Sequence, residues 1–203
     1  YIGGMAIEDG IRGCIEGGFQ GPVWAVNPKY DSLGDQPCFK SIADLPEPPD
    51  ATFISVPREA TIDMVGALSA AGAGGAVCYA AGFSEIGAAG ADHQAAIIDA
   101  AGDFAAMGPN CFGFVNFVDR VGLWPMGHAD HTVEHGPAFI AQSGNVTLNL
   151  MYNMRSVPFS YMISCGNEAV IGTSDFIEVL LDDPRVTAIG LYIEAIRDVD
   201  RFS

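Results

Sequence analysis

Residues 138–151 read AFIAQSGNVTLNLM, and this stretch decides the fold of the second half of the chain. Its first six residues form a short apolar run of the kind that becomes a buried strand. Gly144 then permits a tight turn, and from Asn145 apolar residues recur at helical spacing. A strand that passes through a tight turn into a helix is the repeating unit of parallel α/β sheets.

The same alternation continues to the end of the chain. The spacing of apolar residues predicts helices over 145–155 and 172–181 and strands over 160–166 and 186–194. We therefore expect an incomplete flavodoxin-like domain over residues 137–203.

The first half of the chain also alternates between short apolar runs and helical patterns. The predicted strands are 22–28, 51–57, 74–82 and 103–110, and the predicted helices are 5–18, 59–71 and 85–101. This order predicts a parallel sheet covered on both faces, in a Rossmann-like domain over residues 1–118. The strand that normally opens such a domain is missing, and only Gly3 and Gly4 precede the first helix, where a phosphate loop would end. Residues 119–136 have no sustained period, which predicts an irregular connection.

Composition excludes several classes of function. The 203 residues carry a net charge of −16, with 25 acidic against nine basic residues, so a polyanion such as DNA would be repelled. No apolar run approaches the ~20 residues of a membrane-spanning helix. Five cysteines without a C-x-x-C pair favour a reducing, cytoplasmic location. The chain opens on Tyr1 in mid-motif without a signal sequence, and we expect a truncated chain.

Ligands of open parallel sheets bind beyond the carboxyl ends of the strands, where two segments carry suitable groups. At Ser143, Gly144 and Asn145, free amides and the positive end of a helix dipole suit a phosphoryl group, although Ser143 or Asn145 could instead only cap the helix. Glu194 ends an apolar strand, so we expect its carboxylate to be partly buried and paired.

Three stretches, GPNCFGFVN (108–116), AFIAQSGNVTLNLM (138–151) and SCGNEAVIGTSDFIEVLLDDPRVTAIGLYIEAIRD (164–198), resemble the NDP-forming acyl-CoA synthetase superfamily. That superfamily includes succinyl-CoA synthetase and ADP-forming acetyl-CoA synthetase. Shorter similarities, among them VNPKY and ADLPEPPD, follow in the same order over nearly the whole chain. The resemblance implies a coenzyme A-binding Rossmann-like domain followed by a flavodoxin-like ligase domain.

The resemblance also implies an activity. Such enzymes make acyl-CoA from a carboxylic acid, coenzyme A and ATP, through an acyl phosphate and a phosphohistidine. ADP or GDP, ATP and Mg²⁺ would bind an ATP-grasp domain or subunit that this chain lacks, in an oligomer.

By the same resemblance, coenzyme A would contact a set of residues at the strand ends. They are Gly3, Gly4, Lys29, Val56, Pro57, Ala80, Ala81 and Gly82, with Lys29 on a phosphate. A solvated lysine and ordinary turns remain the alternatives. Glu194 would hydrogen-bond the phosphorylated histidine, while Asn110 and Asn167 would line the same site.

The histidines of this chain do not supply the phosphorylated residue. None of His93, His128, His131 and His135 lies in an S-H-T-G context, which we expect after Ser203, so this polypeptide alone should be inactive. The last three form H-x2-H-x3-H, but no cysteine or carboxylate completes a tetrahedral set, and we predict no metal site.

Other interpretations remain open. A coenzyme A-binding regulatory domain, for example of a protein acetyltransferase, would also lack the histidine. An NAD-dependent dehydrogenase needs G-x-G-x-x-G and an acid where Lys29 stands, and Cys111 has no nearby histidine to activate it as a nucleophile. Residues 122–128 (GLWPMGH) suggest the hypothesis of an acyl group larger than acetate.

Overall fold

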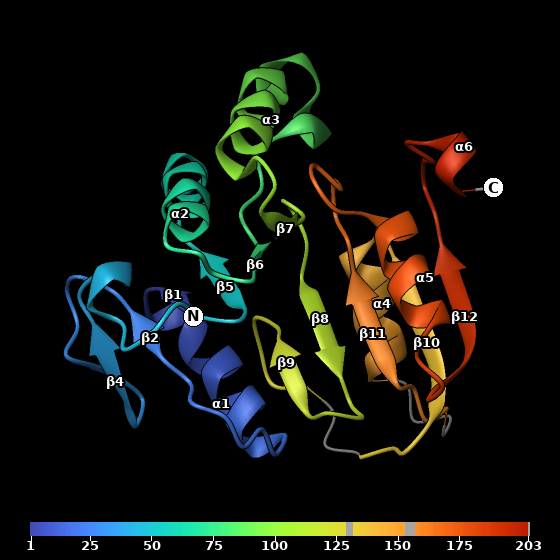
Figure 1. Cartoon of the computed structure of the whole chain (residues 1–203), viewed down its shortest axis with the longest axis horizontal. Coiled ribbons are helices and arrows are strands. Elements are labelled where there is room, and N and C mark those ends of the chain that lie inside the picture. Colours follow the sequence, from blue (N-terminus) through green and yellow to red (C-terminus); the bar gives the residue numbers. More distant parts are fainter. Residues whose placement is uncertain (129–131, 153–156, 203) are drawn as a thin grey trace.

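The computed structural model describes residues 1–128, 132–152 and 157–202. Two sheets lie side by side, the first drawn in blue to green and the second in yellow-green to red (Figure 1). The first has the strand order β3-β4-β2-β1-β5-β6-β7 and the second β12-β10-β11-β8-β9. Every described helix is too short or too polar to cross a bilayer.

The first sheet is parallel except for the edge pair β3–β4. Its strands are β1 (Ile2–Gly3), β2 (Ala25–Val26), β3 (Ser32–Leu33), β4 (Gln36–Phe39), β5 (Thr52–Ser55), β6 (Gly75–Cys78) and β7 (Ala105–Met107). Its helices are α1 (Glu8–Glu16), α2 (Arg58–Ala70) and α3 (Ala88–Ala101), with 3-10 turns η1 (Met5–Ile7), η2 (Ile42–Asp44) and η3 (Ser84–Ile86). The predicted alternation of strands and helices is confirmed.

The second sheet is mixed. Its strands are β8 (Gly113–Asn116), β9 (Val121–Leu123), β10 (Gly136–Ala141), β11 (Tyr161–Ser164) and β12 (Val186–Tyr192), and its helices are α4 (Gly144–Met151), α5 (Thr173–Leu181) and α6 (Val199–Phe202). β10, β11 and β12 are parallel, as predicted. The predicted helix 145–155 is confirmed up to Met151, and 153–155 lie outside the described residues.

The prediction that the opening strand is missing is wrong. β1 lies at the centre of the first sheet, where Ile2 is opposite Val26 of β2 and Ile54 of β5. Two residues are too few to form a recognisable apolar run, so only the long-range pairing reveals this strand.

The prediction of an irregular connection over residues 119–136 is also wrong. It contains β9, which pairs antiparallel with β8, and β8 pairs antiparallel with β11. The Asn116 side-chain oxygen accepts the N–H groups of Val118 and Asp119 (3.0 and 2.9 Å) and so stabilises the turn between the strands. The sheets therefore divide between β7 and β8. Strands as short as β8 and β9, with glycines and prolines around them, leave no apolar run long enough to predict a strand from the sequence.

The two sheets share one hydrophobic core. Phe53 and Val77 of the first sheet belong to the same buried cluster as Ile140 and Ile163 of the second. Main-chain hydrogen bonds also connect the two halves of the molecule. The amides of Asn167 and Ala169 donate to the carbonyls of Pro109 (2.9 Å) and Gly108 (2.7 Å). These bonds hold the carboxyl end of β7 against the loop after β11.

A charged cluster on Arg185 joins β11, the start of β12 and the β8–β9 turn. The guanidinium contacts Asp183 (2.8 Å) and Asp119 (2.7 Å), and the Tyr161 hydroxyl donates to Asp183 (2.7 Å). Its hydrogen bonds with Arg185 hold the pKa of Asp183 well below the usual range, and Arg185 also lowers the pKa of Asp119.

Replacing Arg185 with leucine should make the free energy of unfolding depend less steeply on pH in the acid range. Carboxyls with a depressed folded-state pKa stabilise the fold above their unfolded pKa, and this contribution is lost as pH falls below about 4. The wild-type free energy of unfolding should therefore fall more steeply between about pH 5 and pH 2 than that of Arg185→Leu in urea titrations. Arg12→Leu, which removes an exposed pair with Asp9, is the control. Equal slopes in all three proteins would contradict this.

Candidate functional site

A cavity of about 470 Å³ lies between the two sheets. It is lined by Tyr79, Ala81, Asn110, Cys111, Phe112, Gln142, Ser143, Gly144, Asn145 and Glu194. These residues follow the carboxyl ends of β6 and β7 in one sheet and of β10 and β12 in the other. This is the edge at which open parallel sheets bind ligands. Four groups of predicted site residues thus meet there: Ala81, Asn110, the 143–145 segment and Glu194.

The polar end of the cavity is the start of α4. Ser143 is the N-cap residue with an extended backbone, and its hydroxyl makes no capping hydrogen bond. The first intrahelical bond is from Thr147 N–H to the Ser143 carbonyl (3.2 Å). The amides of the first turn therefore have no intrahelical acceptor and carry the positive end of the helix dipole. The purely capping role that the sequence left open for Ser143 is absent, which favours an anion site.

Gln142 ties this segment to Glu194. Its side-chain oxygen accepts the N–H groups of Glu194 (2.8 Å) and Ala195 (2.9 Å), and its amide group donates to the Ala195 carbonyl (2.7 Å). These three bonds fix the main chain that carries Glu194. Because Gln142 immediately precedes Ser143, they also fix the position of Glu194 relative to the amides of α4.

The Glu194 side chain itself differs from the prediction. It is exposed, whereas the sequence predicted partial burial. β12 is the edge strand of its sheet and ends at Tyr192, which leaves the carboxylate exposed among the residues that the structure describes. Glu194 lines the open cavity and is accessible to a group that enters it.

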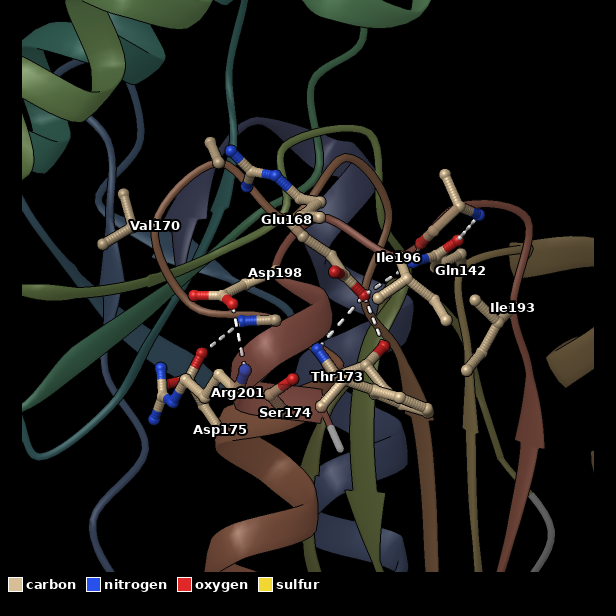
Figure 2. A pocket seen from close by; sticks show the side chains of 15 residues that line it. Gln142, Glu168, Val170, Thr173, Ser174, Asp175, Ile193, Ile196, Asp198 and Arg201 are labelled. Atoms are coloured by element: carbon tan, nitrogen blue, oxygen red, sulfur yellow. Dashed lines mark hydrogen bonds and ion pairs between the residues drawn. The ribbon is translucent and has the colours of Figure 1, made fainter.

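Glu168 is a buried acid behind this arrangement, with 5% of its surface exposed. Its Oε1 accepts hydrogen bonds from Gln142 Nε2 (3.1 Å) and from the amide (3.1 Å) and hydroxyl of Thr173 at the start of α5. Figure 2 shows the Glu168 carboxylate between Gln142 and Thr173, beside a second cavity of about 290 Å³. Gln142 lines both cavities. Glu168 thus determines which end of the Gln142 amide faces Glu194.

Truncating Glu168 to alanine should destabilise the protein by about 2–4 kcal/mol, because the buried donors of Gln142 and Thr173 lose their acceptor. Glu168→Gln keeps one acceptor oxygen and should cost less than about 1 kcal/mol. Chemical denaturation of the two variants and the wild type measures the difference. If both variants lose the same stability, the acceptor role assigned to Oε1 is wrong.

Asn110 and Asn167 meet across the joint between the sheets. Asn110 Nδ2 donates to Asn167 Oδ1 (3.4 Å), and Asn167 Nδ2 donates to Glu85. Glu85 also accepts the N–H group of Phe83 (3.2 Å) and that of Gly82. Asn110 lines the cavity, whereas Asn167 reaches it only through Asn110. The loop after β6 is therefore hydrogen-bonded to the ligand-facing side of the second sheet.

The remaining predicted residues lie along the carboxyl edge of the first sheet. Gly3 ends β1 and Gly4 follows it, Lys29 follows β2, Val56 and Pro57 follow β5, and Ala80 and Gly82 follow β6. A side chain at Gly3 would contact Ser55 O and Ile7 at 2.7 Å, so only glycine fits there. Gly82 has a φ of 103°, and Arg58 donates to its carbonyl (2.8 Å).

Charge at this edge suits an anionic ligand. Lys29 is exposed, and among the described residues no acid pairs with its ammonium group. Arg58, at the start of α2, is a second cation at this edge that sequence reasoning missed, and its guanidinium is paired with Glu59 (2.7 Å). The position of an arginine directly after the Val56-Pro57 strand end is the signal that could have identified it.

The structure does not support a chemical role for the other candidates. Cys111 is buried, and burial raises the pKa of its thiol, which supports its rejection as a nucleophile. Trp124 is fully buried, so the 122–128 stretch cannot present it to an acyl group, contrary to the hypothesis from sequence. Within the described ranges no three histidine, cysteine or acidic side chains are placed to hold a metal. His131 lies outside those ranges.

Residues 11–116 match the family model of the CoA binding domain, and residues 134–203 match that of the succinyl-CoA ligase like flavodoxin domain. Trans-feruloyl-CoA synthase FCS1 from an unknown prokaryotic organism is 34% identical over 92% of this chain. Acetate–CoA ligase (ADP-forming) I of Archaeoglobus fulgidus is 33% identical over 91% of it. This chain spans 27% of the length of either relative.

A solved structure extends the comparison to the fold. The dinucleotide forming acetyl-coenzyme A synthetase 1 of Ca. Korarchaeum cryptofilum, in complex with phosphate and ADP, superposes with a TM-score of 0.86 at 27% identity. The match covers 94% of this chain and 42% of that one. The predicted order of a coenzyme A-binding domain followed by a flavodoxin-like ligase domain is confirmed. The chain therefore belongs to the NDP-forming acyl-CoA synthetase superfamily.

Proposed function

We propose that this chain forms the coenzyme A-binding and phosphoryl-handling part of an ADP-forming acid–thiol ligase. One observation carries the proposal: the uncapped start of α4 and Glu194 line the same cavity and are tied together by Gln142. A phosphoryl group needs the bare amides, and a histidine that carries it needs a carboxylate partner. Neither requirement applies to a domain that only binds coenzyme A.

Coenzyme A would lie along the carboxyl edge of the first sheet. Lys29 would pair with a phosphate, as a flexible ammonium group does, and Gly4, where an added Cβ atom would meet no atom within 4 Å, would leave the backbone open to the nucleotide part. Ala81 lines the cavity, so the pantetheine end would enter over the loop after β6. Coenzyme A supplies the thiol that takes the acyl group from an acyl phosphate, with inorganic phosphate as the other product.

The amides of Gly144 and Asn145 would hold the phosphoryl oxygens, and the Glu194 carboxylate would accept the N–H group of the phosphorylated histidine. That histidine, and the ATP-grasp part that would bind ATP or ADP with Mg²⁺, would come from other segments or from a partner subunit. Two relatives from Pyrococcus furiosus are named as alpha subunits, which supports an assembly. We infer a cytoplasmic oligomer.

The full-length gene product provides the test. With ATP, Mg²⁺, coenzyme A and a carboxylic acid, it should form a CoA thioester and release ADP and phosphate. Isothermal titration should show binding of coenzyme A and none of NAD. Coenzyme A binding without any thioester would indicate the regulatory module instead, and binding of NAD alone would indicate a dehydrogenase.

The relatives leave the acid open. One is named for trans-feruloyl-CoA and others for acetate, so their names allow both an aromatic and a small aliphatic acid. Within the proposed function, the substrate is a carboxylic acid that fits the cavity next to α4.

A further inference from the structure

Two aromatic rings form one wall of the cavity. Tyr79 and Phe112 both line it, with ring centroids 5.9 Å apart and an interplanar angle of 28°. Both side chains are half-buried, so part of each remains accessible. We call this pair the aromatic wall. The accessible parts of the two rings give this side of the cavity an apolar aromatic surface, against which aromatic ligands can pack.

The aromatic wall is held firmly in place. Phe53 packs against Tyr79 (5.8 Å between ring centroids), and the fully buried Trp124 packs against Phe112 (5.4 Å). The Phe112 amide donates to Ser164 Oγ (3.3 Å). A ligand that stacks on these rings would therefore order few new side chains, which lowers the entropic cost of binding.

The aromatic wall also lies next to the proposed phosphoryl site. Phe112 contacts Gly144 so closely that a Cβ atom there would lie 2.6 Å from Phe112 Cε2. In an acyl phosphate a single bridging oxygen separates the phosphorus from the acyl carbon. An acyl group whose phosphoryl end is at the amides of α4 thus has the aromatic wall as its neighbouring apolar surface.

The polar side chains that line the cavity come from residues other than these two aromatic ones. Gln142, Ser143, Asn145 and Glu194 offer donors and acceptors but no apolar surface of comparable size. A carboxylate with a small methyl group would leave the rings uncovered, whereas a flat ring would cover them. Apolar surface removed from water contributes roughly 25 cal/mol per Å², so the larger acid gains more.

We propose that the acid substrate is a planar aromatic carboxylic acid whose ring stacks on Tyr79 and Phe112. This inference rests on the ligase activity proposed above and specifies the acid that the site takes. Phe112 and Tyr79 are then the residues that determine acyl specificity.

The test uses the full-length gene product with cinnamate, benzoate and acetate, and measures CoA thioester formation with each acid. The wild type should show a KM for cinnamate at least about tenfold below that for acetate. Phe112→Leu and Tyr79→Leu should each raise the KM for cinnamate about three- to tenfold and change that for acetate by less than about twofold. Phe159→Leu, in an aromatic pair with Phe139 away from the cavity, should change neither.

The outcomes separate the two proposals. A wild type that turns over acetate but prefers it to both aromatic acids overturns the acyl inference and leaves the ligase activity standing. Equal loss with acetate and cinnamate in the two wall variants also overturns it, because the rings would then be structural. No thioester from any acid removes the ligase proposal and this inference with it. The wild-type comparison remains decisive even if a variant fails to fold.

Discussion

Replacing Glu194 with glutamine is expected to lower CoA thioester formation by the full-length protein by about 10²- to 10⁴-fold, the range for a lost acid–base partner. The glutamine amide keeps the size of the side chain but cannot stabilise the positive charge that develops on a histidine partner. The main-chain bonds to Gln142 use the backbone of Glu194 and Ala195, so the position of residue 194 should persist.

Two measurements make this result specific. Coenzyme A affinity should be unchanged, because Glu194 lines the cavity at the second sheet and not at the edge of the first. Glu16→Gln, at an exposed position of α1, should retain full activity. Undiminished turnover by Glu194→Gln would show that this carboxylate is not the histidine's partner.

Adding one methyl group at Gly144 should cost about 10²-fold in thioester formation, since a misplacement of about 1 Å at a reacting centre has this effect. The new Cβ atom would lie 2.6 Å from Phe112 Cε2. The Phe112 ring cannot retreat, because Tyr79 and Trp124 pack against it. The start of α4 must therefore move, and its amides move with it.

Acetate is the suitable substrate for this test, since it reports on the phosphoryl site without engaging the aromatic wall. Gly127→Ala is the matched control, because a Cβ atom there meets nothing within 4 Å. The double variant Gly144→Ala/Phe112→Leu removes the ring edge that causes the clash and should recover part of the activity. A double variant as impaired as Gly144→Ala alone would assign the loss to another cause.

Sequence patterns predicted the elements whose signals are local. The strand–turn–helix at 138–151 and the alternation around it became β10, α4 and their neighbours because each apolar run is long enough to recognise. The same patterns placed Ser143, Gly144 and Glu194 at strand ends, and parallel pairing then brought these ends to one cavity. β1 was not predicted because it has only two residues and is defined by its pairing with other strands.

The residues that support the site were harder to predict. Gln142 bonds to main chain 52 residues away, and Glu168 reaches Gln142 from a turn in which its φ is 54°. Neither contact leaves a periodic trace in the sequence. The exposure of Glu194 was predicted wrongly because VTAIGLYIE reads as a buried strand, whereas β12 is the sheet edge. Whether a strand lies at the centre or at the edge depends on sheet order, which one sequence does not reveal.

The Gln142 bonds couple the start of α4 to the main chain of Glu194. Tyr79 and Ala81 line the same cavity from the loop that follows β6 of the first sheet. Within the proposed function, substitutions at Tyr79 or Ala81 would therefore change the acid that is accepted and leave the hydrogen bonds of Gln142 in place. Under this proposal, related proteins can evolve different acid specificities through substitutions at a few positions, while the residues that hold phosphate stay the same.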